Sequence, residues 1–227
     1  MTPSEAERLL KHGGWLATLP ASASAALLAA GRIRTLADHA PAYRMGDRGD
    51  GLYAVLEGEI RLVGHSAAGR RLVYLILRPG DWFGEISVLD GRPRFHDAVA
   101  SGPSTVLHVG SERIDALAAT HAGFDRALGA LTCTHQRTAL AFVERALTAP
   151  PLARLAFLLN ELAGRSGPPV PGAGLRLTQE ELAGMVGLSR QSLAGLLARL
   201  RRDGLIATGY GEVTVLDPER LRRIGDR

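Results

Sequence analysis

The sequence predicts an α+β fold in which a long helix separates two folded parts. Between Arg32 and Val109, short runs of alternating apolar and polar residues are separated by turn residues, which is typical of an antiparallel sandwich or barrel. After Ser111 the apolar residues follow helical spacing. Further along, two short helical patterns flank Gly187, and a hairpin pattern follows them. These observations indicate a β-domain, a long helix and a small helical domain with a hairpin, in that order.

Composition limits the class of protein without naming a function. The chain has 227 residues, of which 46% are hydrophobic and 22% charged, and its formal net charge is +4. Such a chain buries one or two ordinary cores. The positive excess suits a nucleic-acid partner, although an arginine bias of the genome explains much of it. The sequence shows neither an apolar signal segment nor a membrane-length apolar run, so we expect a cytoplasmic protein without a membrane partner.

Short helices are expected before the strands begin. Residues 3–31 contain the apolar Trp15 and Leu19, a break at Pro20 and an Ala/Leu-rich run that stops at Gly31. Four of the following strands can be placed individually. They are Leu52–Leu56, Ile60–Val63, Arg71–Leu77 and Thr105–Val109, with turns predicted at 57–58, 67–69 and 78–81.

A long helix is predicted from about Ala122 to Leu147. Its apolar residues resemble heptads over barely three repeats, and Pro150-Pro151 ends it. We therefore expect domains at 1–121 and 150–227, joined by a helix and hinge at 122–149. Cys133 is the only cysteine, which excludes an internal disulfide. Its helical surroundings favour a packed, inert thiol over a redox sensor.

The C-terminal region divides into five further segments. They are a helix at 152–163, a loop at 164–174, the helix pair at 178–202, a hairpin that pairs 205–207 with 213–215, and a helix at 218–224. Thr178 and Glu181 form a predicted capping box for the first helix of the pair. Gly187 permits the positive φ of a sharp turn, and Ser189 caps the second helix. Leu193, Leu196, Leu197 and Leu200 form the buried stripe of that helix.

This arrangement leaves polar side chains outward at the start of the second helix. Arg190 can donate two hydrogen bonds to guanine, and Gln191 can pair similarly with adenine. Short polar groups nearby suit phosphates, which position a helix without reading sequence. They are Thr178, Gln179, Ser189 and Ser192. The alternative is an ordinary helical hairpin with a polar face, which does not account for the caps, the turn glycine and the hairpin together.

The segment Leu177–Ile206 resembles the winged helix-turn-helix of the CRP/FNR (catabolite activator) family of bacterial transcription regulators. A second segment agrees, because Pro79–Arg94 (PGDWFGEISVLDGRPR) is similar to that family's phosphate-binding cassette. The resemblance covers about Leu16 to Ile224. It implies a double-stranded β-helix (jelly roll) that resembles a cyclic-nucleotide-binding domain, with flanking helices, and a function in DNA binding rather than catalysis.

The resemblance also implies a ligand site in the cassette. Gly84, Glu85 and Ile86 open a short helix, Glu85 can accept a ribose 2′-hydroxyl, and Arg94 can pair with a phosphate. Thr138 of the long helix offers a hydroxyl to a base. Phe95 departs from the family pattern, which has a small residue there, and its ring is expected to occupy the space beside the phosphate. The pocket therefore takes a cyclic nucleotide such as cyclic AMP, takes another ligand, or binds none and holds an internal Glu85–Arg94 ion pair.

A reader of this type is expected to be a homodimer. One recognition helix contacts few base pairs, whereas two copies read a palindromic operator with half-sites about 34 Å apart. The helix from Ala122 is the expected dimer seam, and RNA polymerase is an expected partner of the resulting activator or repressor. Gly195 replaces a second base-reading arginine of many relatives, so Arg190 and Gln191 are expected to carry most of the readout.

Two rival functions remain. One is a ligand-independent DNA-binding regulator with a degenerate effector pocket. The other is a jelly-roll metalloenzyme, which requires clustered histidine and carboxylate ligands on facing strands. The seven histidines show no spaced metal pattern, and His96 is interpreted as structural or as part of the pocket rim, since the side chains of His96 and Asp97 should point to opposite faces of a strand. A haem sensor with one axial histidine stays open.

Overall fold

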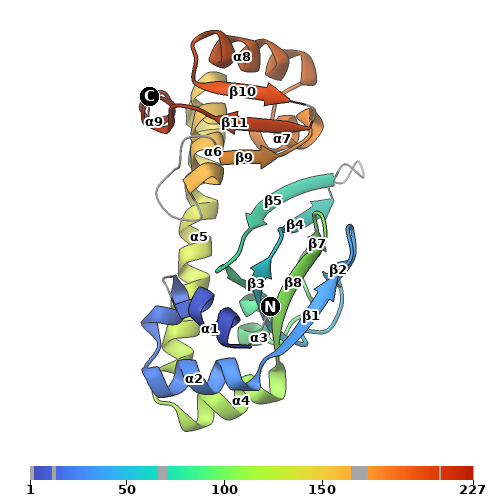
Figure 1. Cartoon of the computed structure of the whole chain (residues 1–227), viewed down its shortest axis with the longest axis vertical. Helices are drawn as coiled ribbons and strands as arrows, with labels where there is room; N and C mark the ends of the chain where they lie inside the picture. Colours follow the sequence, from blue (N-terminus) through green and yellow to red (C-terminus); the bar gives the residue numbers. More distant parts are fainter. Residues whose placement is uncertain (1–2, 12–13, 66–70, 165–172, 210, 227) are drawn as a thin grey trace. The chain divides into compact units, whose positions relative to one another are not determined.

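The computed structural model describes residues 3–11, 14–65, 71–164, 173–209 and 211–226 (Figure 1). The chain forms two compact units. The first contains Met1–Gly64 and Tyr74–Thr138, and the second contains His65–Val73 and Ala139–Arg227. The predicted turn at 67–69 and most of the predicted loop at 164–174 lie outside the described residues.

The first unit begins with short helices, as predicted. They are α1 (Pro3–Lys11), the 3-10 helix η1 (Trp15–Thr18) and α2 (Ala21–Ala30). Trp15 packs edge-to-face on Trp82, with ring centroids 5.2 Å apart, and its indole N–H donates to the carbonyl of Ala127. These contacts fix the N-terminal helices to the β-domain and to the start of the long helix.

In the described part of the chain, eight strands build a β-sandwich. They are β1 (Arg32–Leu36), β2 (Pro41–Tyr43), β3 (Gly51–Glu57), β4 (Ile60–His65), β5 (Arg71–Leu77), β6 (Trp82–Phe83), β7 (Asp97–Ala100) and β8 (Ser104–Gly110). One sheet has the order β1-β8-β3-β6 and the other β2-β7-β4-β5. Tyr53, Phe83 and Val106 of the first sheet share a buried cluster with Leu62 and Ala98 of the second. The core therefore lies between the sheets, as the alternating strands predict.

Three further helices follow in the described residues, and the last of them, α5, continues from the first unit into the second. They are α3 (Glu85–Asp90), α4 (Ser111–Thr120) and α5 (Phe124–Thr148). The buried residues of α5 lie in its first third and include Phe124, Leu128 and Leu131. Further along the same helix Leu140 and Leu147 are 56% and 81% exposed.

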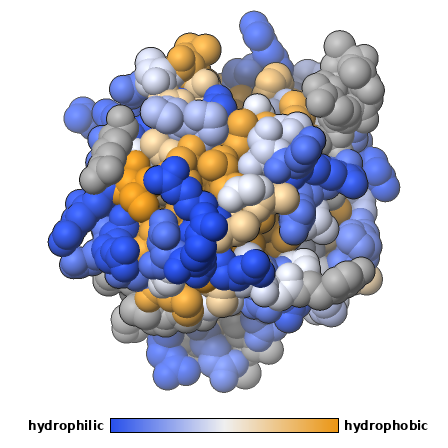
Figure 2. Space-filling model, turned by 90° about the horizontal axis from the view of Figure 1, so that it is seen from above, coloured by the Kyte–Doolittle hydropathy of each residue, from blue (hydrophilic) through white to orange (hydrophobic). Residues whose placement is uncertain are grey.

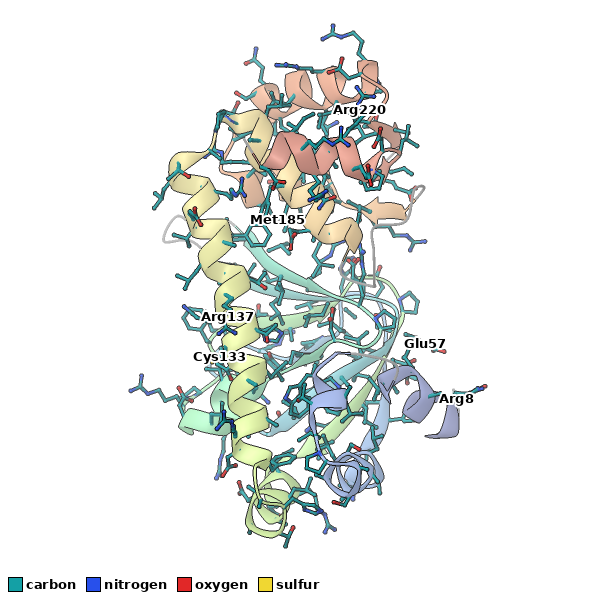
Figure 3. All side chains as sticks on the ribbon, turned by 90° about the vertical axis from the view of Figure 1, so that its left-hand side faces the viewer. Arg8, Glu57, Cys133, Arg137, Met185 and Arg220 are labelled. Carbon is teal, nitrogen blue, oxygen red and sulfur yellow. The ribbon has the colours of Figure 1, made fainter. Side chains whose placement is uncertain are left out.

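The prediction that Cys133 is packed is wrong. Its side chain is exposed on α5, one helical turn from the exposed Arg137, and Figure 3 shows both residues on the same part of this helix. The buried face of α5 carries Leu128 and Leu131 instead, so the apolar neighbours of Cys133 in sequence do not surround it in space.

The second unit contains the C-terminal elements. They are α6 (Pro151–Gly164), β9 (Ala173–Arg176), α7 (Gln179–Val186), α8 (Arg190–Arg202), β10 (Ile206–Gly209), β11 (Glu212–Val215) and α9 (Pro218–Gly225). Ile206 pairs with Val215 and Gly209 with Glu212, which confirms the hairpin. The predicted loop is wrong at 173–174, because β9 adds a third strand through pairing with β11. Its sequence, AGLR, has little intrinsic strand preference, so the partner strand determines its conformation.

The described part of the chain contains neither a metal-binding cluster nor a membrane-spanning helix. No group of three His, Cys, Asp or Glu side chains is placed to hold a metal ion there. None of the helices described is both long enough and apolar enough to cross a bilayer.

Gly51 should be essential to the sandwich. Its φ is +139°, and a Cβ would lie 2.0 Å from the carbonyl oxygen of Val109 on the neighbouring strand. We expect Gly51→Ala to lower the free energy of unfolding by at least about 2 kcal/mol, since strain and backbone overlap add. Gly46 is the matched control, because its φ is also positive but no described atom lies within 4 Å of its Cβ position. Urea denaturation that gave equal losses for Gly51→Ala and Gly46→Ala would contradict this account.

Candidate effector site and nucleic-acid interface

The cassette is built around a glycine in a left-handed conformation. Gly84 has φ +94° and caps α3. A Cβ at this position would lie 2.9 Å from Arg94 Nη1 and 3.0 Å from the carbonyl oxygen of Gly51. Only glycine therefore allows both the turn into α3 and the close approach of Arg94 to the backbone.

Arg94 is buried, and its guanidinium group is held by three hydrogen bonds. Nη1 donates to the Gly84 carbonyl at 2.7 Å, and Nη2 donates to Asp50 Oδ1 at 2.6 Å and to the Gly51 carbonyl at 2.7 Å. The group also lies 4.1 Å from the ring centroid of Tyr43, a cation–π contact. The Nε–H of Arg94 has no hydrogen-bond partner among the described residues.

Asp50 is the counter-ion of this arginine. Burial alone would raise the pKa of Asp50, but hydrogen bonds from Tyr53 and Arg94 hold that pKa below its ordinary value. Asp50 thus stays ionised at neutral pH. It neutralises the Arg94 guanidinium, which was expected to pair with the phosphate of a ligand.

Glu85 finds its partner on the long helix. Its side chain is buried, and Oε1 accepts a hydrogen bond from Nδ1 of His135 at 2.9 Å. Because Glu85 pairs with His135 and Arg94 with Asp50, the alternative of an internal Glu85–Arg94 ion pair is wrong. The structure instead connects the cassette to α5 within the first unit.

Phe95 does not fill the cassette, so that prediction is also wrong. The residue is 68% exposed, and its ring is almost parallel to that of Tyr74, at 20° and 6.4 Å between centroids. The next residue, His96, turns inward and makes a 3.1 Å hydrogen bond with the Tyr43 hydroxyl. Burial lowers the pKa of His96, which is consistent with a structural role at the edge of the site.

The remaining predicted ligand residues contribute less than expected. Ile86 is 41% exposed. Thr138 is half-buried, and its hydroxyl donates to the carbonyl of Thr134 at 3.1 Å, so the hydroxyl hydrogen is already used within the helix. Three residues of the site carry no signal in the sequence, because Asp50 and Tyr43 lie 44 and 51 positions before Arg94, and His135 lies 50 after Glu85. These separations are too long for any spacing rule.

The predicted helix-turn-helix is confirmed in its local geometry. The Thr178 hydroxyl accepts from the Glu181 backbone N–H, and the Glu181 carboxylate accepts from the Thr178 N–H, both at 3.1 Å. Gly187 has φ +66° between the helices. Ser189 Oγ accepts from the Ser192 N–H at 3.1 Å. Leu193, Leu197 and Leu200 are buried, and Leu196 is half-buried.

All six predicted DNA-contacting residues are exposed at the starts of α7 and α8. They are Thr178, Gln179, Ser189, Arg190, Gln191 and Ser192. The guanidinium group of Arg190 forms an ion pair with the Glu180 carboxylate of α7. Gly195 is exposed, with no described atom within 4 Å of its Cβ position.

The surface of this unit is rich in arginine beyond the predicted residues. Arg199, Arg201 and Arg202 lie in the last turn of α8, and Arg222 and Arg223 lie at the end of α9. Figure 2 views the molecule from the end that α8 occupies in Figure 1, and hydrophilic side chains surround an apolar centre on this face. The arginines in the last turn of α8 suit contact with a phosphate backbone.

Each of the two units matches a known protein family. Residues 33–121 match the family model described as a cyclic nucleotide-binding domain, and residues 153–224 match the Crp-like helix-turn-helix domain. A CRP-like cAMP-activated global transcriptional regulator of Mycobacterium tuberculosis is 33% identical over 188 residues, which cover 78% of this chain and 81% of that protein. The transcriptional regulator LdrP of Thermus thermophilus is 32% identical over 183 residues, which cover 80% of this chain and 90% of LdrP.

A solved structure agrees with these relatives. The crystal structure of a CRP-family transcriptional regulator from Thermus thermophilus superposes with a TM-score of 0.67 at 27% identity, and the match covers 86% of this chain and 97% of that one. The sandwich, the long helix and the capped helix-turn-helix thus occur together in known regulators. The chain belongs to the CRP/FNR (catabolite activator) family of DNA-binding transcription regulators, which are not enzymes.

Proposed function

We propose that this protein acts in the cytoplasm as a homodimer that binds a palindromic operator and regulates transcription in response to a small ligand. The observation that carries the proposal is the exposed Arg190-Gln191 pair at the start of a capped α8. Arg190 and Gln191 read base edges, while Thr178, Gln179, Ser189 and Ser192 contact phosphates. The bound dimer activates or represses by its position relative to RNA polymerase.

The ligand site of this proposal lies in the cassette. Arg94 Nε and the Glu85 carboxylate offer a donor and an acceptor, and the proposed site also includes Gly84, Ile86, Phe95 and Thr138. A cyclic nucleotide is the first candidate, because the Mycobacterium tuberculosis relative is named as cAMP-activated. Ligand binding then shifts the helix and hinge at 122–149, which resets the spacing of the two recognition helices between the domains at 1–121 and 150–227.

A specific observation favours a second candidate function. Asp50 already neutralises Arg94, and His135 already occupies Glu85. A pocket whose charges are satisfied internally belongs equally to a ligand-independent regulator. Addition of metabolite extract in a DNA-binding titration separates the two, since only the ligand-modulated form changes its affinity.

The dimer should depend on the exposed apolar side of α5. Leu140, Val143 and Leu147 share one side of the helix and are 56%, 53% and 81% exposed. We expect the double change Leu140→Asp and Val143→Asp to convert a dimer into a monomer at micromolar concentration, because it buries two charges at the seam. Sedimentation velocity measures this. Thr134→Asp is the control, since Thr134 is exposed on the opposite side of α5, and a wild-type chain that sediments only as a monomer contradicts the proposal.

Binding of a cyclic nucleotide should depend on Arg94. We expect calorimetry with cyclic AMP or cyclic GMP to give micromolar binding to the wild type and none to Arg94→Ala, because the phosphate loses its donor. Arg94 also holds the backbone, so Glu85→Gln provides a second test that preserves shape and removes only the charged acceptor. No heat with either nucleotide at millimolar concentration rejects both as the ligand.

Sequence readout should depend on Arg190. We expect Arg190→Ala to weaken binding to the operator by about 1–3 kcal/mol, since one bidentate contact to a base is lost, and to affect random DNA far less. Fluorescence anisotropy against both duplexes at one salt concentration measures the difference. Arg202→Ala, in the last turn of α8, is the matched control. Equal losses on both duplexes for Arg190→Ala would assign Arg190 to a phosphate instead.

A further inference from the structure

Two aromatic side chains lie exposed at the edge of the cassette. Phe95 is 68% and Tyr74 is 46% exposed, and their rings are 6.4 Å apart at an interplanar angle of 20°. Exposed rings of this size retain hydrophobic free energy that a partner can recover. Their near-parallel orientation aligns the planes of the two rings.

The Tyr74 ring is seated on the backbone of the neighbouring strand. A Cβ at Gly64 would lie 2.2 Å from the Tyr74 hydroxyl oxygen and 2.4 Å from Cζ. Any other residue at position 64 would displace the ring. Gly64 therefore leaves the space in which the Tyr74 ring lies almost parallel to that of Phe95.

A chain of side-chain contacts connects the Phe95 ring to Arg94, the charged residue at the centre of the cassette. Its edge faces the His96 ring at 89° and 6.0 Å, His96 bonds to the Tyr43 hydroxyl, and the Arg94 guanidinium lies over the Tyr43 ring. Arg94 is 3% exposed, and its Nε–H lacks a partner among the described residues. His96 and Tyr43 thus connect an exposed aromatic surface to a buried cation that has one N–H to donate.

The long helix, by contrast, offers little to the edge of a base. The Thr138 hydroxyl donates to the Thr134 carbonyl, so its hydrogen is not available to a base. A ring bound here has few hydrogen-bond partners from α5, whereas Tyr74 and Phe95 offer contact with its faces.

We propose that Tyr74 and Phe95 form a stacking platform for the base of a nucleotide ligand whose phosphate takes the Arg94 Nε–H. This inference rests on the proposed ligand-modulated function and names how that ligand is selected. Because every base has a π face, stacking tolerates different bases. The platform therefore separates cyclic AMP from cyclic GMP by less than about tenfold.

Calorimetry on the full-length protein tests the platform. The probes are cyclic AMP, cyclic GMP and ribose 5-phosphate, which has no base. Tyr74→Leu and Phe95→Leu keep apolar bulk and remove the π face, so we expect each to weaken both cyclic nucleotides by roughly five- to hundredfold. Phe95→Tyr should bind within about twofold of the wild type, and ribose 5-phosphate should bind all four proteins equally.

Leu89→Ala is the matched control. Leu89 is an exposed apolar residue of α3, at 44%, and its loss should leave nucleotide affinity unchanged. Unchanged affinity in Tyr74→Leu and Phe95→Leu, with binding still lost in Arg94→Ala, overturns the platform and leaves the proposed function intact. A gain of affinity in Phe95→Leu also overturns it, because the ring would then obstruct the site. Absence of nucleotide binding to the wild type rejects the platform together with the nucleotide ligand.

Discussion

The hydrogen bonds of one buried arginine hold the effector site together. Arg94 connects the glycine that begins α3, the start of β3 and the Asp50 carboxylate. Removing one partner of a buried charge pair is costly, commonly about 3–5 kcal/mol. The cost here is moderated because the side chain of Asp50 is 45% exposed and keeps part of its hydration. The glycines at 51 and 84 are needed for the same reason, since a Cβ at either position overlaps the backbone or the guanidinium group.

The same interaction limits what a ligand can gain. An anion that enters the cassette meets an arginine already neutralised by Asp50, so the Coulomb attraction available to it is smaller than for an isolated cation. The hydrogen bond from His135 to Glu85 has an equivalent effect on the acceptor side. A ligand that used Glu85 would compete with His135, a residue of the helix that continues to Thr148. Competition of this kind changes the environment of α5 without any direct contact between ligand and DNA-binding unit, which is the type of differential contact that a population shift requires.

Local signals in the sequence were sufficient for the helix-turn-helix. Thr178 with Glu181, Gly187 and Ser189 act within three residues of their own positions, so the pattern alone determined caps and turn. The strands at 52–56 and 105–109 were equally visible from alternation. The features that the sequence did not predict depend on contacts between residues far apart in the chain. Strand β9 exists because β11 lies beside it, Cys133 is exposed because Leu128 and Leu131 take the buried face, and Arg94 found Asp50 rather than Glu85. Phe95 is outward because Arg94 and His96, on either side of it, both turn inward.

The helix-turn-helix, like the cassette, contains an arginine paired with a carboxylate, but here both side chains are exposed. Arg190 pairs with Glu180, and their side chains are 68% and 75% exposed, so the contact is worth little and yields readily to a stronger acceptor. A guanine edge offers two acceptors in the geometry of the guanidinium fork, whereas the gain from replacing a carboxylate with a single phosphate oxygen is smaller. If Arg190 reads a base as proposed, Glu180 weakens non-specific binding more than specific binding. Gly195 provides no side chain further along α8, so under the proposed readout discrimination depends on this competition and on Gln191. A carboxylate on α7 is then part of how α8 distinguishes one sequence from another.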